Sequence, residues 1–207
     1  MPSSLRDSLS EKQLRLFDEA HVASYNRRRK SDKYRLHSEL GPSAFDGDID
    51  AASVILLLAN PGFDHTSSLD DHQFRREGWP LGGLHPDAPS GIRAWWLPRL
   101  RELITAYGEQ AVSQRVACLQ LTPWASTKFD STLRLPSRRV ILEAASRCAT
   151  RGAVMVVMRA EKLWLEAEAL RTTRLRFKVN SNLTSYLSPG NLPPDAWQNV
   201  FEAVRDA

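Results

Sequence analysis

The sequence has very few cysteines and no long apolar run. Among its 207 residues only Cys118 and Cys148 carry a thiol, which excludes a disulfide-rich secreted scaffold and the four-cysteine ligand set of an iron–sulfur cluster. No apolar run approaches the roughly 18 residues that a membrane-spanning helix needs. The first residues also lack the apolar stretch of a secretory leader. We therefore expect a cytoplasmic protein with reduced, buried thiols and no membrane contact.

Several motifs for cofactor binding and catalysis are also missing. There is no GxGxxG after the first predicted strand and no GxxxxGK[ST], so neither a dinucleotide site nor a triphosphate-binding loop is indicated. A GxSxG nucleophile elbow is absent as well. His65, His72 and His85 fall in one loop but lack the i, i+4 spacing of a helical zinc site. We therefore expect neither a metal nor a cofactor.

The charge balance is mildly basic. The formal net charge is +4 and the sequence pI is about 9.3, which is compatible with nucleic-acid binding, although a genomic bias toward arginine produces the same excess. The run RRRK at residues 27–30 is open to two interpretations. It is either a solvated helix end, which the helix dipole favours, or a contact to phosphates.

The hydrophobic pattern predicts one α/β domain. Residues 54–59, 116–121 and 153–158 form apolar runs without polar alternation, as expected for strands buried on both faces of a parallel sheet. Residues 174–179 alternate between apolar and charged, which predicts a half-exposed strand at a sheet edge. Helical patterns separate the strands. We therefore predict a three-layer α/β/α fold with a mostly parallel central sheet over residues 1–207, in which residues 1–40 form a helical N-terminal extension.

Asn60-Pro61-Gly62 follows directly on the first buried strand. In such sheets ligands bind at the carboxyl ends of the strands, so this turn should lie at the functional edge. Pro61 restricts the backbone of Asn60 and its own φ, and Gly62 allows close approach of a ligand. An amide held rigidly there can position a substrate or a water, although it is a poor general base. Taken alone, the same three residues can also be a plain tight turn.

A second motif, Ser188-Pro189-Gly190-Asn191, lies just before the predicted C-terminal helix. With Asn60-Pro61-Gly62, in the same order and strand context, it gives the chain a resemblance to the uracil-DNA glycosylase superfamily. The stretch LLLANPG looks most like the Asn-Pro-Gly motif of the mismatch-specific uracil/thymine branch, and YLSPGNL looks like the DNA-intercalating loop. The resemblance covers about residues 45–204 and implies the fold of that superfamily.

The resemblance also implies roles for individual residues. Asn60 would hold the water that attacks C1′ of a nucleotide flipped out of the duplex. Ser188, Pro189 and Gly190 would pinch DNA phosphates. From their loop positions and chemistry we expect a base pocket of Pro61, Gly62, Phe63, Asp64 and Trp124, with Phe63 or Trp124 stacking on the base. The DNA-contacting set would add Tyr186, Asn191, Arg138 and Arg139, although both arginines are equally compatible with plain surface charges.

The chain departs from the superfamily pattern in three respects. The strongest uracil enzymes have an aspartate where this chain has Asn60, so slow chemistry is expected. Tyr186 and Leu187 stand where many members have a histidine. The middle strand ends in LQLTPW, without the specificity asparagine. The pattern is therefore that of a little-characterised bacterial branch.

Three functions remain open from the sequence. The first is a DNA-binding, glycosylase-like protein that excises a damaged or modified base by hydrolysis of the N-glycosidic bond. The second is a non-catalytic module of the same fold that binds a nucleotide, a nucleic acid or a protein. The third is a hydrolase of small nucleosides. Trp95 and Trp96 are expected to pack in the core in each case.

Overall fold

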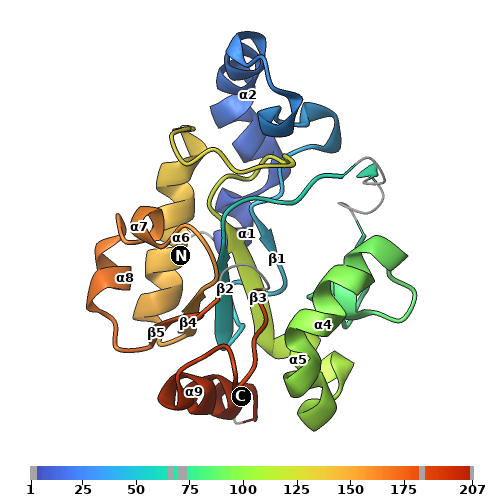
Figure 1. The fold of residues 1–207 in the computed structure, drawn as a ribbon, viewed down its shortest axis with the longest axis vertical. Helices are drawn as coiled ribbons and strands as arrows, with labels where there is room; N and C mark the ends of the chain where they lie inside the picture. The colour runs from blue at the N-terminus through green and yellow to red at the C-terminus, as the bar shows by residue number, and fades with distance from the viewer. Residues whose placement is uncertain (1–3, 65–67, 70–73, 182–184, 206–207) are drawn as a thin grey trace.

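The chain folds around a five-stranded mixed sheet (Figure 1). The computed structural model describes residues 4–64, 68–69, 74–181 and 185–205. The strand order is β1-β3-β2-β4-β5. The strands are β1 (Phe45–Asp46), β2 (Val54–Leu58), β3 (Val116–Gln120), β4 (Val154–Val157) and β5 (Arg176–Lys178). The prediction of an α/β fold with a mostly parallel sheet is confirmed.

The parallel strands coincide with the apolar runs of the sequence. Every residue of β2 and β4 is buried, and β3 is buried up to its last residue. The half-exposed β5 forms one edge of the sheet, as the alternation predicted. The other edge is β1, which pairs antiparallel with β3 through Phe45↔Leu119 and Asp46↔Cys118. The sequence pattern around β1 indicated only turns, because two residues are too few to show a period.

Helices cover both faces of the sheet, which gives three layers. Alternate residues of the central strands enter opposite hydrophobic clusters, with Ile55 and Leu57 on one face and Leu56 and Leu58 on the other. One face packs against α6 (Ser137–Thr150), α7 (Glu161–Trp164) and α8 (Glu168–Thr172). The other face packs against α4 (Ser90–Tyr107), α5 (Glu109–Arg115) and α9 (Pro194–Arg205). Within the described ranges, no helix combines the length and apolarity needed to cross a bilayer.

The N-terminal extension is helical and is anchored on the loop after β3. It contains α1 (Leu5–Ser8), α2 (Glu11–Arg28), and the short 3-10 helices η1 (Asp32–Tyr34) and η2 (Ser38–Leu40). In Figure 1, α2 lies beyond one end of the sheet. The completely buried Asp18 of α2 accepts hydrogen bonds from the Trp124 indole nitrogen and the Ser137 backbone nitrogen, both at 2.9 Å. These bonds fix the position of the loop between β3 and α6.

The chain changes direction across the sheet at β2. From β2 it passes through α4 and α5 to β3 on one side, and from β3 it crosses through α6 to β4 on the other side of β2. Open α/β sheets bind ligands in the crevice outside the strand ends at such a switch point. The carboxyl end of β2, where Asn60 follows, lies at this position.

Candidate functional site

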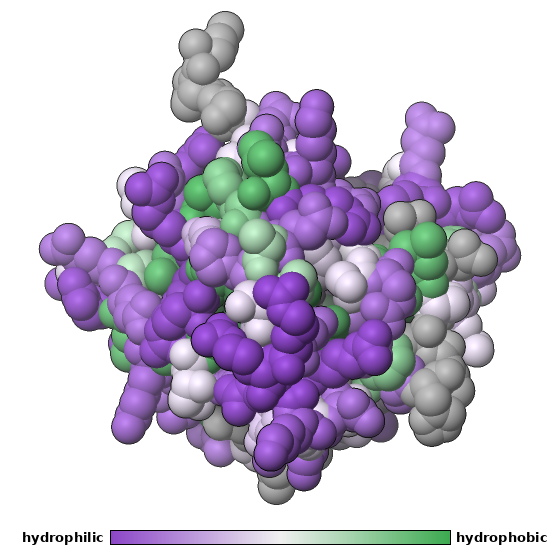
Figure 2. Space-filling model, turned by 90° about the horizontal axis from the view of Figure 1, so that it is seen from above, coloured by the Kyte–Doolittle hydropathy of each residue, from purple (hydrophilic) through white to green (hydrophobic). Residues whose placement is uncertain are grey.

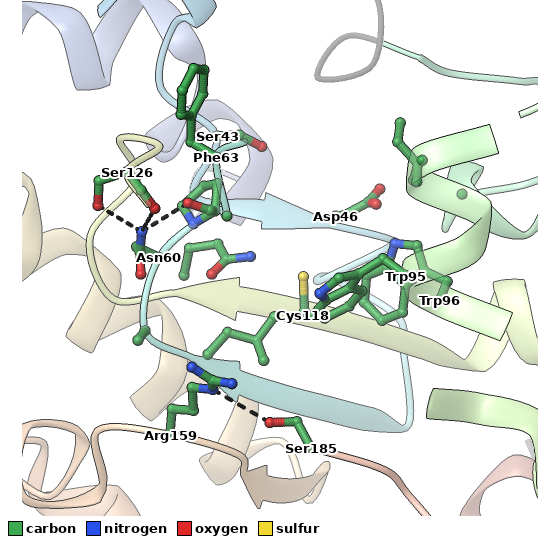
Figure 3. Close-up of a pocket in the computed structure, with 18 of the residues that line it drawn as sticks. Ser43, Asp46, Asn60, Phe63, Trp95, Trp96, Cys118, Ser126, Arg159 and Ser185 are labelled. Atoms are coloured by element: carbon green, nitrogen blue, oxygen red, sulfur yellow. Dashed lines mark hydrogen bonds between the residues drawn. The ribbon is translucent and has the colours of Figure 1, made fainter. Parts of the chain in front are cut away.

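A cavity of about 670 Å³ opens at the carboxyl end of β2. Its volume falls within the usual range of small-molecule sites. The loop after β2, the loop after β3, the β1 strand and the first turns of α4 line it. Figure 3 shows Asn60 and Ser126 on one side, Asp46 and Trp96 on the other, and Cys118 between them. The cavity therefore brings together residues from distant parts of the sequence around the predicted Asn60.

The Asn60 side chain is fixed by three hydrogen bonds. Its Nδ2 atom donates to the Pro61 carbonyl oxygen at 2.8 Å, to the Ser126 carbonyl oxygen at 3.1 Å and to the Ser126 Oγ at 3.0 Å. The loop that carries Ser126 is in turn held to the first loop, because the Ser126 backbone nitrogen donates to the Pro61 carbonyl at 3.2 Å. The predicted rigidity of this amide is thus supplied by a second loop 66 residues away in sequence.

The same bonds determine which end of the Asn60 amide remains free to accept a further hydrogen bond. The Ser126 hydroxyl donates its single proton to the Lys128 carbonyl oxygen at 3.1 Å, so it can only accept from Asn60. Both carbonyl partners of Nδ2 are acceptors as well, which assigns nitrogen to that side of the amide. The Asn60 Oδ1 atom accepts no bond from any residue that the structure describes, and Figure 3 shows it directed away from the bonded side.

Gln120 is a second cavity-lining amide. It ends β3 and pairs in register with Leu58, two residues before Asn60. Its Oε1 atom is buried and has no hydrogen-bond partner within the described part of the chain. A buried polar atom without a partner is costly, so an atom in this position is suited to bind a ligand or a water. The strand lacks the asparagine that the superfamily has at this end, and Gln120 was not among the predicted site residues.

Asp46 faces the cavity from the opposite side. Burial raises the pKa of its carboxyl group above the usual range, and the positive charge of Arg75 partly offsets this effect. The carboxyl group accepts hydrogen bonds from Gly47, at 3.0 Å, and from Trp96 and Gly82. With these donors Asp46 connects β1 to α4 and to η3 (Gly82–Leu84). We interpret it as a support of the cavity wall.

The aromatic residues of the cavity differ from those predicted. Trp124 is completely buried, donates to Asp18 and does not line the cavity, so its assignment to the base pocket is wrong in this structure. Phe63 does line the cavity, but one face of its ring stacks on His37, with 3.4 Å between ring centroids. Trp95 and Trp96, expected in the core, both line the cavity, and only Trp96 is also buried.

The other predicted pocket residues lie at the cavity. Pro61 is buried, and its carbonyl oxygen accepts from Asn60 and Ser126. A Cβ atom built on Gly62 would meet no other atom within 4 Å, so open space begins at this backbone. Asp64 is exposed and lines the cavity as well.

The predicted C-terminal loop lies beside the cavity rather than in it. Of its residues, Ser185 lines the cavity, whereas Tyr186, Ser188, Pro189, Gly190 and Asn191 do not. Tyr186 is 40% exposed, and the Arg99 guanidinium lies 6.0 Å from its ring centroid. Pro189 and Gly190 are exposed as well, and Ser188 is partly buried. These four residues are thus placed where an extended ligand can reach them.

Asn191 has a structural part in this loop. It is buried, and its side-chain amide donates to the Tyr186 carbonyl oxygen at 2.8 Å and accepts from the Ser181 backbone nitrogen at 2.7 Å. These bonds close the loop from within, so the side chain is not available to DNA. Its assignment as a DNA-contacting residue is therefore wrong in this structure.

The two arginines at the start of α6 differ in how deeply they are buried. Arg138 is 7% exposed and forms an ion pair with Glu166 at 2.7 Å, so the prediction that it contacts phosphate is wrong in this structure. Arg139 is exposed on the same helix and does not line the cavity.

The described residues offer no group of three or more histidine, cysteine or acidic side chains that could hold a metal ion. His65 and His72 lie outside the described residues, and His85 bonds the Asp87 backbone nitrogen. Cys118 and Cys148 are free thiols in the core, and burial raises both pKa values, that of Cys148 to about 11. Comparisons with protein-family models, with curated proteins and with solved structures found no match.

Proposed function

We propose that this chain is a DNA-binding, glycosylase-like protein that hydrolyses the N-glycosidic bond of a nucleotide held in the cavity. One observation carries the proposal: the Asn60 amide lines the cavity and is fixed through its nitrogen, and its oxygen accepts no bond from any residue that the structure describes. An oxygen in that position can accept a hydrogen bond from a water molecule and hold it in one orientation, and positioning of a reactant lowers the barrier to reaction.

In the proposed hydrolysis, one bond forms, one bond breaks and one proton is released. The oxygen of the positioned water forms a bond to C1′, and the bond from C1′ to the base nitrogen breaks with its electron pair leaving on the base. The proton lost by the water passes to solvent or to the leaving base. Asn60 takes no proton in this scheme, because an amide does not titrate near neutral pH, and slow turnover is expected.

The recognition of a base would fall to the second amide. Gln120 offers a donor and an acceptor at the end of the middle strand, where the resemblance led us to look for an asparagine. Its Oε1 atom, which no residue of the described part of the chain bonds, supports this role. Trp95 lines the cavity with an aromatic ring, one face of which is covered by the Arg99 guanidinium at 4.1 Å, and the remaining ring surface suits stacking on a base.

The surface near the cavity supports binding of a polyanion. Lys128 lines the cavity, and its backbone nitrogen donates to the Lys33 carbonyl oxygen at 2.7 Å, which places the N-terminal extension at the cavity rim. The exposed run at residues 27–30 belongs to the same extension. Figure 2 looks onto the end of the molecule where α2 lies and shows a largely hydrophilic face around a smaller apolar area. DNA bound through such residues should dissociate as salt rises.

A cleavage screen tests the proposal. Labelled single- and double-stranded oligonucleotides would carry uracil, hypoxanthine, xanthine or mismatched thymine. We expect slow release of at least one base, a loss of about tenfold or more in Asn60→Ala, and DNA affinity within about twofold of the wild type. Asn199→Ala is the matched control, because it removes the same side chain from α9.

Three results would redirect the proposal. Parallel loss of binding and cleavage in Asn60→Ala would contradict the positioning role. Salt-sensitive DNA binding without cleavage of any substrate would favour the non-catalytic binding module, which the poor basicity of Asn60 also supports. Cleavage of free nucleosides with no DNA binding would instead favour the nucleoside hydrolase.

A further inference from the structure

Two arginines line the cavity without an acidic partner. Arg99 lies on α4, and Arg159 follows β4. Neither forms an ion pair with a residue that the structure describes. In contrast, the partly buried Arg93 pairs with Glu109, and the buried Arg138 pairs with Glu166. Two neighbouring cations that face a cavity without an acidic partner leave positive potential there, and such potential attracts anions.

The hydrogen bonds of Arg99 are incomplete. Its Nη1 donates to the Trp95 carbonyl oxygen at 2.6 Å, and its guanidinium lies 4.1 Å from the Trp95 ring centroid. These contacts hold the group in place, yet its Nε atom is buried and has no partner within the described part of the chain. Burial lowers the pKa of Arg99, Tyr186 raises it, and the positive charge of Arg159 lowers it further. Arg99 and Arg159 line the same cavity, and their positive charges repel each other.

Arg159 lies beside two unusual backbone positions, one next to it in sequence and one that it contacts. Its Nε donates to the Ser185 Oγ at 3.4 Å (Figure 3). Ala160, the next residue, has φ 57°, and Ser185 has φ 51°; they are the non-glycine residues with positive φ in the described part of the chain. Non-glycine residues adopt this conformation at an energetic cost, and such strain collects at functional sites.

From this arrangement we infer that Arg99 and Arg159, with the Ser185 hydroxyl, form an anion subsite that holds a phosphate group of the nucleotide in the cavity. Guanidinium groups bind phosphate with paired, directional N–H donors, and a dianion between Arg99 and Arg159 would relieve their repulsion. The identity of the occupant as a nucleotide rests on the proposed function, whereas the anion subsite itself does not. The phosphate can belong to a mononucleotide or to a DNA backbone.

Binding of small ligands tests this inference without requiring catalysis. Affinities would be measured by calorimetry for inorganic phosphate, for the four deoxynucleoside monophosphates, for the matching nucleosides and for a tetranucleotide. We expect at least one monophosphate or the tetranucleotide to bind about tenfold or more tightly than any nucleoside. In Arg99→Gln and Arg159→Gln this advantage should fall about 10- to 100-fold, as for loss of a hydrogen bond to a charged group.

Arg101→Gln is the matched control, because it removes the same charge from an exposed position on α4. Each variant would first be shown to keep the melting temperature of the wild type, and Arg99→Lys, which retains the charge, should keep part of the affinity. If Arg99→Gln and Arg159→Gln lose affinity for both the monophosphates and the tetranucleotide, the subsite is established and a mononucleotide is sufficient to occupy it. If they lose affinity for the tetranucleotide only, the subsite is established and the phosphate comes from the DNA backbone.

Three results would overturn the inference. The first is equal affinity of the wild type for nucleosides and their phosphates. The second is an unchanged phosphate advantage in both glutamine variants, and the third is an equal loss in Arg101→Gln. Absence of base release alone leaves the subsite intact, because that result bears only on the proposed function.

Discussion

The two walls of the cavity differ in how completely their polar groups are bonded. The amide wall, formed by Asn60, Pro61 and Ser126, has a set of hydrogen bonds that uses the Asn60 nitrogen and leaves the Asn60 oxygen without a donor among the described residues. The arginine wall, formed by Arg99, Arg159 and Ser185, carries two cations and a buried Arg99 Nε that has no partner within the described ranges. The first wall is built before a ligand arrives, whereas the second needs an anion to complete it.

The two walls therefore have different effects on a ligand: the amide wall orients it, and the arginine wall attracts it. A rigid, neutral amide can hold a small molecule in one geometry, but it attracts nothing over a distance. The cationic groups of the arginine wall attract an anion at long range, and this attraction weakens as the salt concentration rises. Changes on the amide wall should therefore affect reaction more than binding, and changes on the arginine wall should do the opposite.

The largest expected effect comes from breaking the support beneath the amide wall. In Asp18→Ala, the buried nitrogens of Trp124 and Ser137 lose their acceptor. Each buried, unsatisfied donor costs about 1–3 kcal/mol, so we expect a loss of about 3 kcal/mol in the free energy of unfolding, measured by urea denaturation. Glu19→Ala removes an exposed acid from the next position of α2 and should change stability by less than about 0.5 kcal/mol. Equal effects of both variants would contradict this role of Asp18.

A smaller effect is expected from overpacking behind the arginine wall. In Gly83→Ala, the new Cβ would lie 2.3 Å from the Trp96 side chain and 2.6 Å from the Ile92 side chain, so these side chains or the helix α4 that carries them must shift. Overpacking of this kind costs about 1–3 kcal/mol, and the shift should weaken phosphate binding through Arg99. Gly91→Ala, whose Cβ meets no atom within 4 Å, is the control for stability. A Gly83→Ala protein with wild-type thermal stability would show that this contact is not tight.

The smallest effect is expected from Ser126, a residue of the amide wall, and it tests the difference between the two walls. Ser126→Ala removes one of the three acceptors of the Asn60 amide and leaves the two carbonyl partners in place. A typical hydrogen bond contributes about 1 kcal/mol, so we expect base release to fall up to about fivefold, with DNA affinity unchanged. Ser126→Thr keeps the hydroxyl and should restore the rate. A drop in affinity without a drop in rate would reverse the assignment of the two walls.

The sequence predicted those parts of the fold that depend on local pattern. The buried strands were visible because each is a continuous apolar run between turn residues, and the edge strand because its apolar residues alternate. β1 was missed because a strand of two residues has no period, and only its pairing with β3 reveals it.

The candidate site was predictable only where one residue follows a strand. Asn60 could be found in this way, but its partner Ser126 lies 66 residues later. Trp124 was placed wrongly because its hydrogen-bond partner, Asp18, is 106 residues away. Arg99 and Arg159 could not be singled out among the many arginines, since only the fold shows which of them pair with none of the described acidic residues.

The positive φ values of Ala160 and Ser185 set the stability of the protein against its ability to bind a ligand. Glycine would relax either position, since its lack of a Cβ atom removes the steric cost of a positive φ. Selection for heat resistance alone would therefore favour glycine there, while Arg159 would lose the rigid backbone and the hydroxyl that hold it in place. Substitution by glycine for the sake of stability alone would therefore remove the phosphate subsite before any other part of the site.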